Sequence, residues 1–256
     1  MNVPIVRLAE VRDGLARGEF FLEYQPIVSL ADDRCLGAEA LIRWRRGDHV
    51  IPPSEFIPLV ENTPVSGFIT YWVMEAVTAE LGAWLKENPD VYVSINAPPE
   101  ILGRGGIEYA AVKSGLMSLS SQVMLEITER GIPDPLGVAS INDRGGTGVR
   151  VALDDVTLMG GVSMAVLMRC PFDAIKLDKS LIDQIKPDAP RPDWMGAVRM
   201  LEGSRSKLLV IAEGVDTEYQ VAMLRAANVD AVQGFYFSRP LDTVSLFAFH
   251  RERMPR

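Results

Sequence analysis

The chain has 256 residues, 48% of them hydrophobic, with a formal net charge of -8 at pH 7, and this negative charge argues against broad nucleic-acid binding, which depends on clustered Lys and Arg. Two histidines support neither a histidine-rich metal site nor an acyl-transfer triad, and Cys35 and Cys170 lie too far apart for a CxxC pair and are expected in the core. The sequence has no apolar run of roughly 18 residues and no export-signal pattern, which predicts a cytoplasmic protein without membrane insertion.

Short apolar or β-branched runs alternate with segments of helical spacing along the chain. Eight such runs predict an α/β fold, a TIM-type (β/α)8 barrel. The runs are 20–28, 35–44, 91–97, 123–129, 149–155, 174–178, 208–215 and 231–237. Only the segment SLADDR separates the first two, which is too short for a crossover helix, so the first strand should be antiparallel. Because no composition shift marks a boundary, we expect a single domain over residues 1–256.

Polar residues interrupt the second to eighth runs, roughly one in each and often near the end of the run. They are Glu39, Asn96, Glu126, Asp154, Lys176, Glu213 and Gln233. The carboxyl ends of barrel strands form the mouth in which active sites lie. Each residue alone has a structural explanation, but four carboxylates in one mouth repel each other unless protons or cations compensate. Oxygen ligands without imidazole or thiolate favour Mg²⁺ or Mn²⁺.

Asp154 and Asp155 are adjacent, although neighbours in a regular strand point to opposite faces. One of them must therefore sit where the strand gives way to a loop and turn back toward the mouth. Two acids there could contact two ions, and paired ions commonly serve in-line displacement at phosphorus. The pair predicts phosphodiester hydrolysis.

Several motifs, in order and covering roughly residues 20–241, resemble the EAL domains that hydrolyse the bacterial messenger cyclic di-GMP to linear pGpG. AEAL at 38–41 contains the motif that gives this family its name. The other matches are YQPIVSL, PPSEFIPLVE, VSINA, LEITER, AIKLD, IAEGVDTE and VQGFYFSRPL.

The resemblance implies roles for the polar residues at the predicted mouth. Lys176 is similar to the lysine that orients or polarises the attacking water, Glu213 to a general base or indirect metal ligand, and Gln233 to the residue that supports this network. Ligands of the first metal ion would be Glu39, Asn96, Glu126 and Asp154, with Asp155 available to a second ion and the water.

Gln25 and Arg43 resemble substrate contacts, and Glu129 is similar to the glutamate that anchors the loop after the paired aspartates. In this loop the sequence departs from the family. Asp155 is followed by VTLMGGVS instead of Phe-Gly-Thr-Gly-Tyr-Ser-Ser, which makes the loop one residue longer before Lys176 and removes the Gly-Thr-Gly turn. Because glycines permit positive φ, Val156, Thr157 and Leu158 in their place imply a different backbone path. The family links this loop to dimerisation and to the second metal.

Three hypotheses follow from these patterns. The first is a cyclic di-GMP phosphodiesterase dependent on Mg²⁺ or Mn²⁺, and the intact carboxylates favour it. The second is a cyclic di-GMP receptor with little or no turnover, which the altered loop favours; a tolerated loop variant is the alternative reading. The third is an interaction barrel without a nucleotide, which leaves the carboxylate cluster unexplained. A homodimer is compatible with the first two.

Overall fold

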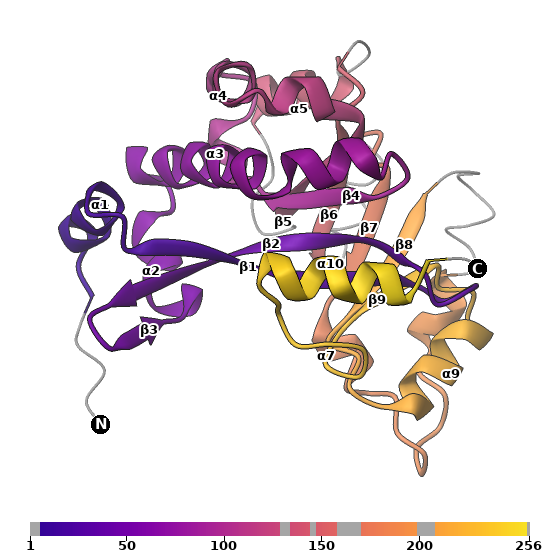
Figure 1. The fold of residues 1–256 in the computed structure, drawn as a ribbon. Coiled ribbons are helices and arrows are strands. Elements are labelled where there is room, and N and C mark those ends of the chain that lie inside the picture. Colours follow the sequence, from indigo (N-terminus) through magenta and orange to yellow (C-terminus); the bar gives the residue numbers. More distant parts are fainter. Residues whose placement is uncertain (1–5, 129–133, 144–146, 158–169, 199–207, 255–256) are drawn as a thin grey trace.

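The computed structural model describes residues 6–128, 134–143, 147–157, 170–198 and 208–254, and eight strands close a barrel in it (Figure 1). They are β1 (Phe20–Ser29), β2 (Cys35–Arg46), β4 (Tyr92–Asn96), β5 (Val123–Thr128), β6 (Arg150–Val156), β7 (Ala174–Leu177), β8 (Leu209–Glu213) and β9 (Ala231–Gln233). β1 is antiparallel to its neighbours β2 and β9, and the other pairs around the barrel are parallel. The predicted barrel with a reversed first strand is confirmed.

Helices cover the outside of the barrel. α3 (Pro64–Glu87), α4 (Gly106–Ser114) and α5 (Pro135–Asn142) lie on one side, α7 (Lys179–Ile182) and α9 (Glu218–Ala226) on another, and α10 (Thr243–Glu252) runs beside β1 (Figure 1). The 3-10 turns η1 (Pro99–Ile101) and η2 (Leu116–Gln122) complete this layer. Side-chain caps start several of these helices, such as Thr63 before α3 and Thr217 before α9. Within the described ranges no helix is long and apolar enough to cross a membrane.

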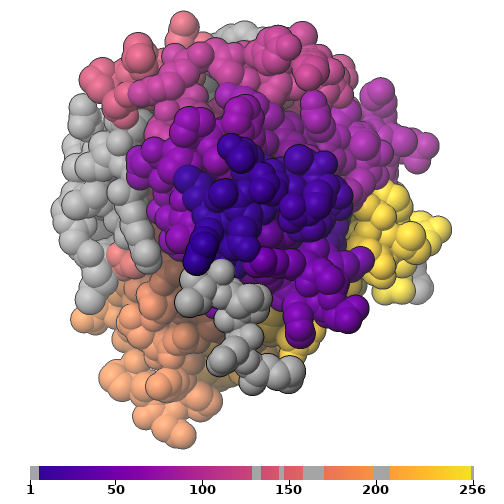
Figure 2. All heavy atoms as spheres, turned by 90° about the vertical axis from the view of Figure 1, so that its left-hand side faces the viewer, coloured from indigo at the N-terminus to yellow at the C-terminus, as the bar shows by residue number. Residues whose placement is uncertain are grey.

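β1 and β2 are longer than the other strands and extend as a hairpin past the barrel mouth. β2 pairs with β4 only as far as Ala40, and its later residues pair with β1 and with β3 (His49–Ile51). Beside the hairpin lie α1 (Leu8–Ala16) and α2 (Pro53–Val60), and Figure 2 shows α1 in indigo against this purple face. Gly14 of α1 packs so closely that a Cβ atom there would lie 2.8 Å from Trp44 Nε1. The extended hairpin is therefore packed against α1 outside the barrel.

Two details differ from the sequence prediction. β3 was not predicted, and the last strand ends at Gln233 instead of continuing to residue 237. The reason lies at Gly234, where a Cβ atom would be 2.2 Å from the carbonyl oxygen of Val215. The chain turns there, and Phe237 N–H donates to the Gly234 carbonyl. Aromatic residues after the glycine thus belong to a turn, although their composition is typical of a strand.

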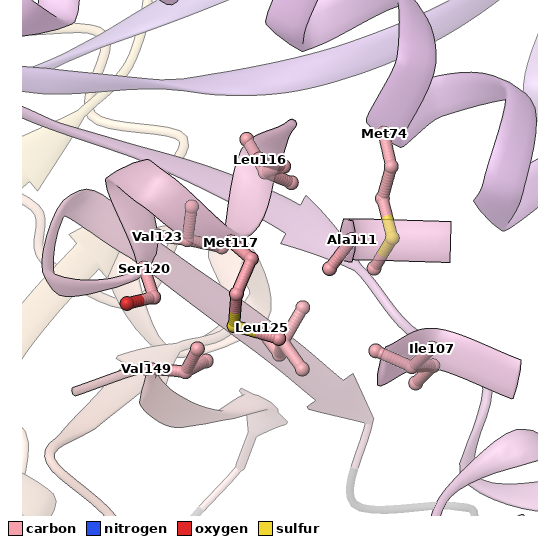
Figure 3. A pocket seen from close by; sticks show the side chains of 9 residues that line it. All are labelled: Met74, Ile107, Ala111, Leu116, Met117, Ser120, Val123, Leu125 and Val149. Carbon is pink, nitrogen blue, oxygen red and sulfur yellow. The ribbon is translucent and has the colours of Figure 1, made fainter. Parts of the chain in front are cut away.

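A small apolar cavity of about 30 Å³ lies outside the barrel, among α3, α4, η2 and β5 (Figure 3). Its lining residues are Met74, Ile107, Ala111, Leu116, Met117, Ser120, Val123, Leu125 and Val149. Leu125 points away from the barrel interior because the next residue, Glu126, points into it. The cavity therefore lies behind β5, away from the barrel interior, and Ser120 is the one polar residue of its lining.

Candidate active site

The centre of the barrel mouth is Lys176, whose side chain is completely buried. Its Nζ lies 2.6 Å from Glu213 Oε1, 2.8 Å from Glu126 Oε2 and 3.0 Å from Glu39 Oε2. Asp154 Oδ1 is slightly farther from Nζ, at 3.5 Å. The four carboxylates come from β2, β5, β6 and β8, so the barrel geometry brings together residues that are far apart in the sequence. The predicted convergence at the carboxyl ends of the strands is present.

Two amides complete the contacts of Glu39. Gln233 donates from Nε2 to Glu39 Oε2 at 2.6 Å, and Asn96 donates from Nδ2 to Oε1 at 2.8 Å. With the ammonium of Lys176, each oxygen of Glu39 accepts at least one hydrogen bond. Burial opposes ionisation of Glu39, but these donors and the positive charge outweigh it and lower its pKa. Glu39 is therefore the carboxylate most firmly held in its ionised form.

The other three carboxyl groups are shifted in the opposite direction. Burial, followed by repulsion from neighbouring carboxylates, raises the pKa of Glu126 well above its ordinary value and also raises that of Asp154. The same causes raise the pKa of Glu213 to about 8. Burial also opposes a charge on Lys176, but the surrounding carboxylates raise its pKa, so it remains an ammonium. One cation does not compensate the whole cluster.

Asp154 and Asp155 lie at an irregularity inside β6. The register with β7 shifts between Leu153 and Val156, and Asp155 adopts a left-handed backbone with φ of 56°. Its N–H donates to Asp154 Oδ1 at 2.9 Å. The prediction that the backbone leaves regular strand geometry here is confirmed, although the cause is a bulge within the strand and not its end.

These residues fit a divalent metal ion. If all four carboxylates were ionised, the single ammonium would leave three negative charges uncompensated. Carboxylate oxygens of Asp154, Asp155 and Glu213 lie within 4.8 Å of one another. In the described part of the chain, Glu126 Oε1 and Gln233 Oε1 are buried without a hydrogen-bond partner. A hard cation would satisfy this oxygen-only donor set.

The two expected substrate contacts lie at different heights above the cluster. Gln25 is buried and is the Cα partner of Glu39, and its Nε2 donates to the Ser238 carbonyl at 2.6 Å. Arg43 is four residues beyond Glu39, on the extended hairpin, where its Nε donates to Glu23 Oε2 at 2.8 Å. The sequence prediction missed Glu23, although its spacing of two residues from Gln25 places it on the same strand face.

Glu129 and most of the altered loop after Asp155 lie outside the described residues. Of the eight residues VTLMGGVS, only Val156 and Thr157 belong to the described ranges. The predicted anchoring of this loop by Glu129 therefore stays a prediction.

Comparison with known proteins agrees with these features. A family model described as EAL domain matches residues 8–240. The chain is 32% identical over 235 residues to the probable cyclic di-GMP phosphodiesterase PdeB of Escherichia coli, covering 90% of this chain and 44% of PdeB. It is also 32% identical over 250 residues to the cyclic di-GMP phosphodiesterase NbdA of Pseudomonas aeruginosa, covering 94% of this chain and 31% of NbdA. The chain therefore spans less than half of either relative.

A solved structure extends the likeness to three dimensions. The PaMucR phosphodiesterase in complex with c-di-GMP matches with a TM-score of 0.81 at 27% sequence identity, covering 93% of this chain and 98% of that one.

Proposed function

Because the chain belongs to the EAL domain family, we propose that it is a cyclic di-GMP phosphodiesterase that opens its substrate to linear pGpG with Mg²⁺ or Mn²⁺. The observation that carries this proposal is the convergence of four carboxylates on Lys176 at the barrel mouth. Relatives described as cyclic di-GMP phosphodiesterases support the reaction class. The whole chain would form one such domain and act in the cytoplasm.

The metal-binding roles divide along the barrel mouth. A first ion would be held by the carboxylate and amide oxygens of Glu39, Asn96, Glu126 and Asp154. Asp155 would add the negative charge for a second ion, since the bulge in β6 turns the backbone at this position. Divalent ions in such a site supply Lewis-acid activation of water and neutralise charge on a phosphodiester.

The remaining polar residues would position water and substrate. Lys176 is held at the mouth by its carboxylate partners and would orient or polarise the attacking water. Glu213 lies 2.6 Å from that ammonium. It would act either as the general base that accepts a proton from the attacking water or as an indirect metal ligand that contacts the ion through a water molecule. Gln233 would keep Glu39 oriented, while Gln25 and Arg43 would contact the substrate and the Arg43 guanidinium would bind phosphate.

The direct test is incubation of the purified protein with cyclic di-GMP and Mg²⁺ or Mn²⁺, followed by chromatography of the products. We expect pGpG, and we expect no product with EDTA or with Asp154→Ala. Asp33→Asn, in the β1–β2 turn, is a matched control that removes a carboxylate outside the cluster and should retain activity. If cyclic di-GMP remains intact after incubation while its binding is still measurable, the phosphodiesterase proposal is refuted and the receptor hypothesis is supported.

The receptor is a second candidate because VTLMGGVS lacks the Gly-Thr-Gly turn of the family's loop. If this loop and its expected anchor, Glu129, weaken the second metal site, replacing residues 156–162 with Phe-Gly-Thr-Gly-Tyr-Ser should raise turnover or lower the metal concentration for half-maximal rate. Cyclic di-GMP affinity in Ca²⁺ should change little, because Gln25 and Arg43 lie on other strands. An unchanged rate and metal dependence in a folded graft would identify the loop as a neutral variant. A homodimer also stays a prediction.

A further inference from the structure

The extended hairpin carries a row of side chains on the same face as the carboxylate cluster. Gln25 is the Cα partner of Glu39, and Glu23 is the partner of Leu41. Since side chains alternate along each strand, Glu23 and Arg43 continue the row outward from the barrel mouth. A phosphodiester whose reacting phosphate lies at the cluster would extend along this row.

The guanidinium of Arg43 is already oriented. Nε donates to Glu23 Oε2 at 2.8 Å, and Nη1 donates to the Ile42 carbonyl at 3.1 Å. Among the described residues, none of its other three N–H groups reaches a protein acceptor, so they form a fork that suits a phosphate. The side chains of Arg43 and Glu23 are 16% and 35% exposed, so the pair is partly buried.

Glu23 has two opposing effects on an anion bound by Arg43. It fixes the guanidinium before binding, which avoids an ordering cost equivalent to about 2- to 10-fold in affinity. Its negative charge also repels the phosphate, by about 4-fold for charges ~5 Å apart in a water-like medium. An uncharged acceptor at this position would keep the first effect and remove the second.

We propose that Glu23 is a positioning residue that orients Arg43 for a substrate phosphate while its charge limits the affinity of this subsite. The inference rests on the proposed function, because it assumes that Arg43 meets a phosphate of cyclic di-GMP. It assigns to Glu23 a role in binding that is separate from the chemistry at Lys176.

The test compares Glu23→Gln with Glu23→Ala, which remove the same charge and differ in the hydrogen-bond acceptor. Steady-state hydrolysis of cyclic di-GMP with saturating Mn²⁺ gives KM and kcat, and calorimetry in Ca²⁺ gives affinity. Glu23→Gln should lower KM by about 2- to 4-fold relative to the wild type. Glu23→Ala should have a KM about 2- to 10-fold above that of Glu23→Gln. Because the chemistry is untouched, kcat should stay within about 2-fold in both.

A double-mutant cycle shows whether Glu23 acts through Arg43. In an Arg43→Ala background, Glu23→Gln and Glu23→Ala should have the same KM, since no guanidinium remains to be oriented. Asp33→Asn is the matched ion-pair control: Asp33 pairs with Arg225 at 2.6 Å in the turn between β1 and β2, and asparagine tolerates its positive φ. This control should leave KM unchanged.

Equal KM values for the two Glu23 variants, or a difference that persists without Arg43, would refute the positioning role. Loss of kcat alone, with unchanged KM, would also refute it. These outcomes are distinct from failure of the proposed function, in which the wild type itself neither binds nor hydrolyses cyclic di-GMP.

Discussion

Replacing Lys176 with methionine tests whether one buried ammonium holds the carboxylate cluster together. The substitution removes the cation that lies 2.6–3.5 Å from four carboxylates and leaves a side chain of similar length. Breaking a buried ion pair from one side typically costs about 3 to 5 kcal/mol, because the partner charge is left uncompensated. We therefore expect Lys176→Met to lower the free energy of unfolding by roughly this amount at pH 8.5 in EDTA.

The cost should depend on pH. Glu126, Asp154 and Glu213 already have raised pKa values, about 8 for Glu213, and loss of the ammonium raises them further. A carboxyl group whose pKa is raised on folding contributes stability that is fully present below its unfolded pKa and is lost as the pH rises through its folded pKa. Each proton linked to unfolding contributes about 1.4 kcal/mol per pH unit. The variant should therefore be much less destabilised at pH 5.5 than at pH 8.5.

Urea unfolding at both pH values, with EDTA and with Mn²⁺, measures these effects. Mn²⁺ should restore much of the lost stability, since it replaces the missing positive charge. Lys113→Met is the control, because that lysine is largely exposed and its 4.0 Å contact with Glu75 is a surface pair. Equal destabilisation at both pH values, or no stabilisation by Mn²⁺, would refute the account of Lys176 as the compensating cation.

Three further predictions concern metal and substrate. Glu39→Ala should abolish hydrolysis by loss of a metal ligand, and unchanged turnover in this variant would contradict the assignment of the metal site. Arg43→Ala should mainly raise KM, at a cost of ~1.5 to 3 kcal/mol in binding free energy. Hydrolysis should proceed with Mg²⁺ or Mn²⁺ and be inhibited by Ca²⁺, which accepts more ligands at longer distances, and equal rates with Ca²⁺ would contradict tight positioning of two ions. Calorimetry should show Mn²⁺ affinity rising from pH 6 to pH 8, because protons on the raised carboxyl groups compete with the metal; a flat profile would show that these groups are not ligands.

Strand periodicity explains how much of the fold and the mouth could be predicted. Period-two alternation places Glu126 and Asp154 on the inner face of their strands, and parallel strands bring their carboxyl ends to one rim. The short SLADDR connection fixes the reversed strand without any information from distant residues. These are local rules, so they could be applied to the sequence directly.

The pairings within the site depend on register and could not be predicted in this way. The contact between Glu23 and Arg43 requires β1 and β2 to pair so that Phe21 faces Arg43, which the sequence does not specify. Likewise, the burial of Lys176 depends on carboxylates from four other strands, which the pattern within its own strand does not specify. The end of β9 depends on contact between Gly234 and Val215, two segments that are separate in the sequence.

Asp155 combines a charge with a left-handed backbone, and substitutions can separate the two. Asparagine tolerates φ near 56° and removes the charge, glycine removes charge and side chain, and alanine retains a Cβ atom that disfavours this conformation by about 1 to 2 kcal/mol. In EDTA, the free energy of unfolding of Asp155→Ala should therefore be lower than that of Asp155→Asn and of Asp155→Gly. Asp155→Asn should also lower the pKa of Asp154, because the Asp155 charge is one of the causes that raise it. Mn²⁺ titration should show weaker binding in all three variants, since each lacks the carboxylate. If Asp155→Ala is as stable as Asp155→Gly, the bulge does not constrain the backbone of this residue. If Asp155→Asn binds Mn²⁺ as tightly as the wild type does, Asp155 is not a metal ligand and only shapes the backbone beside Asp154.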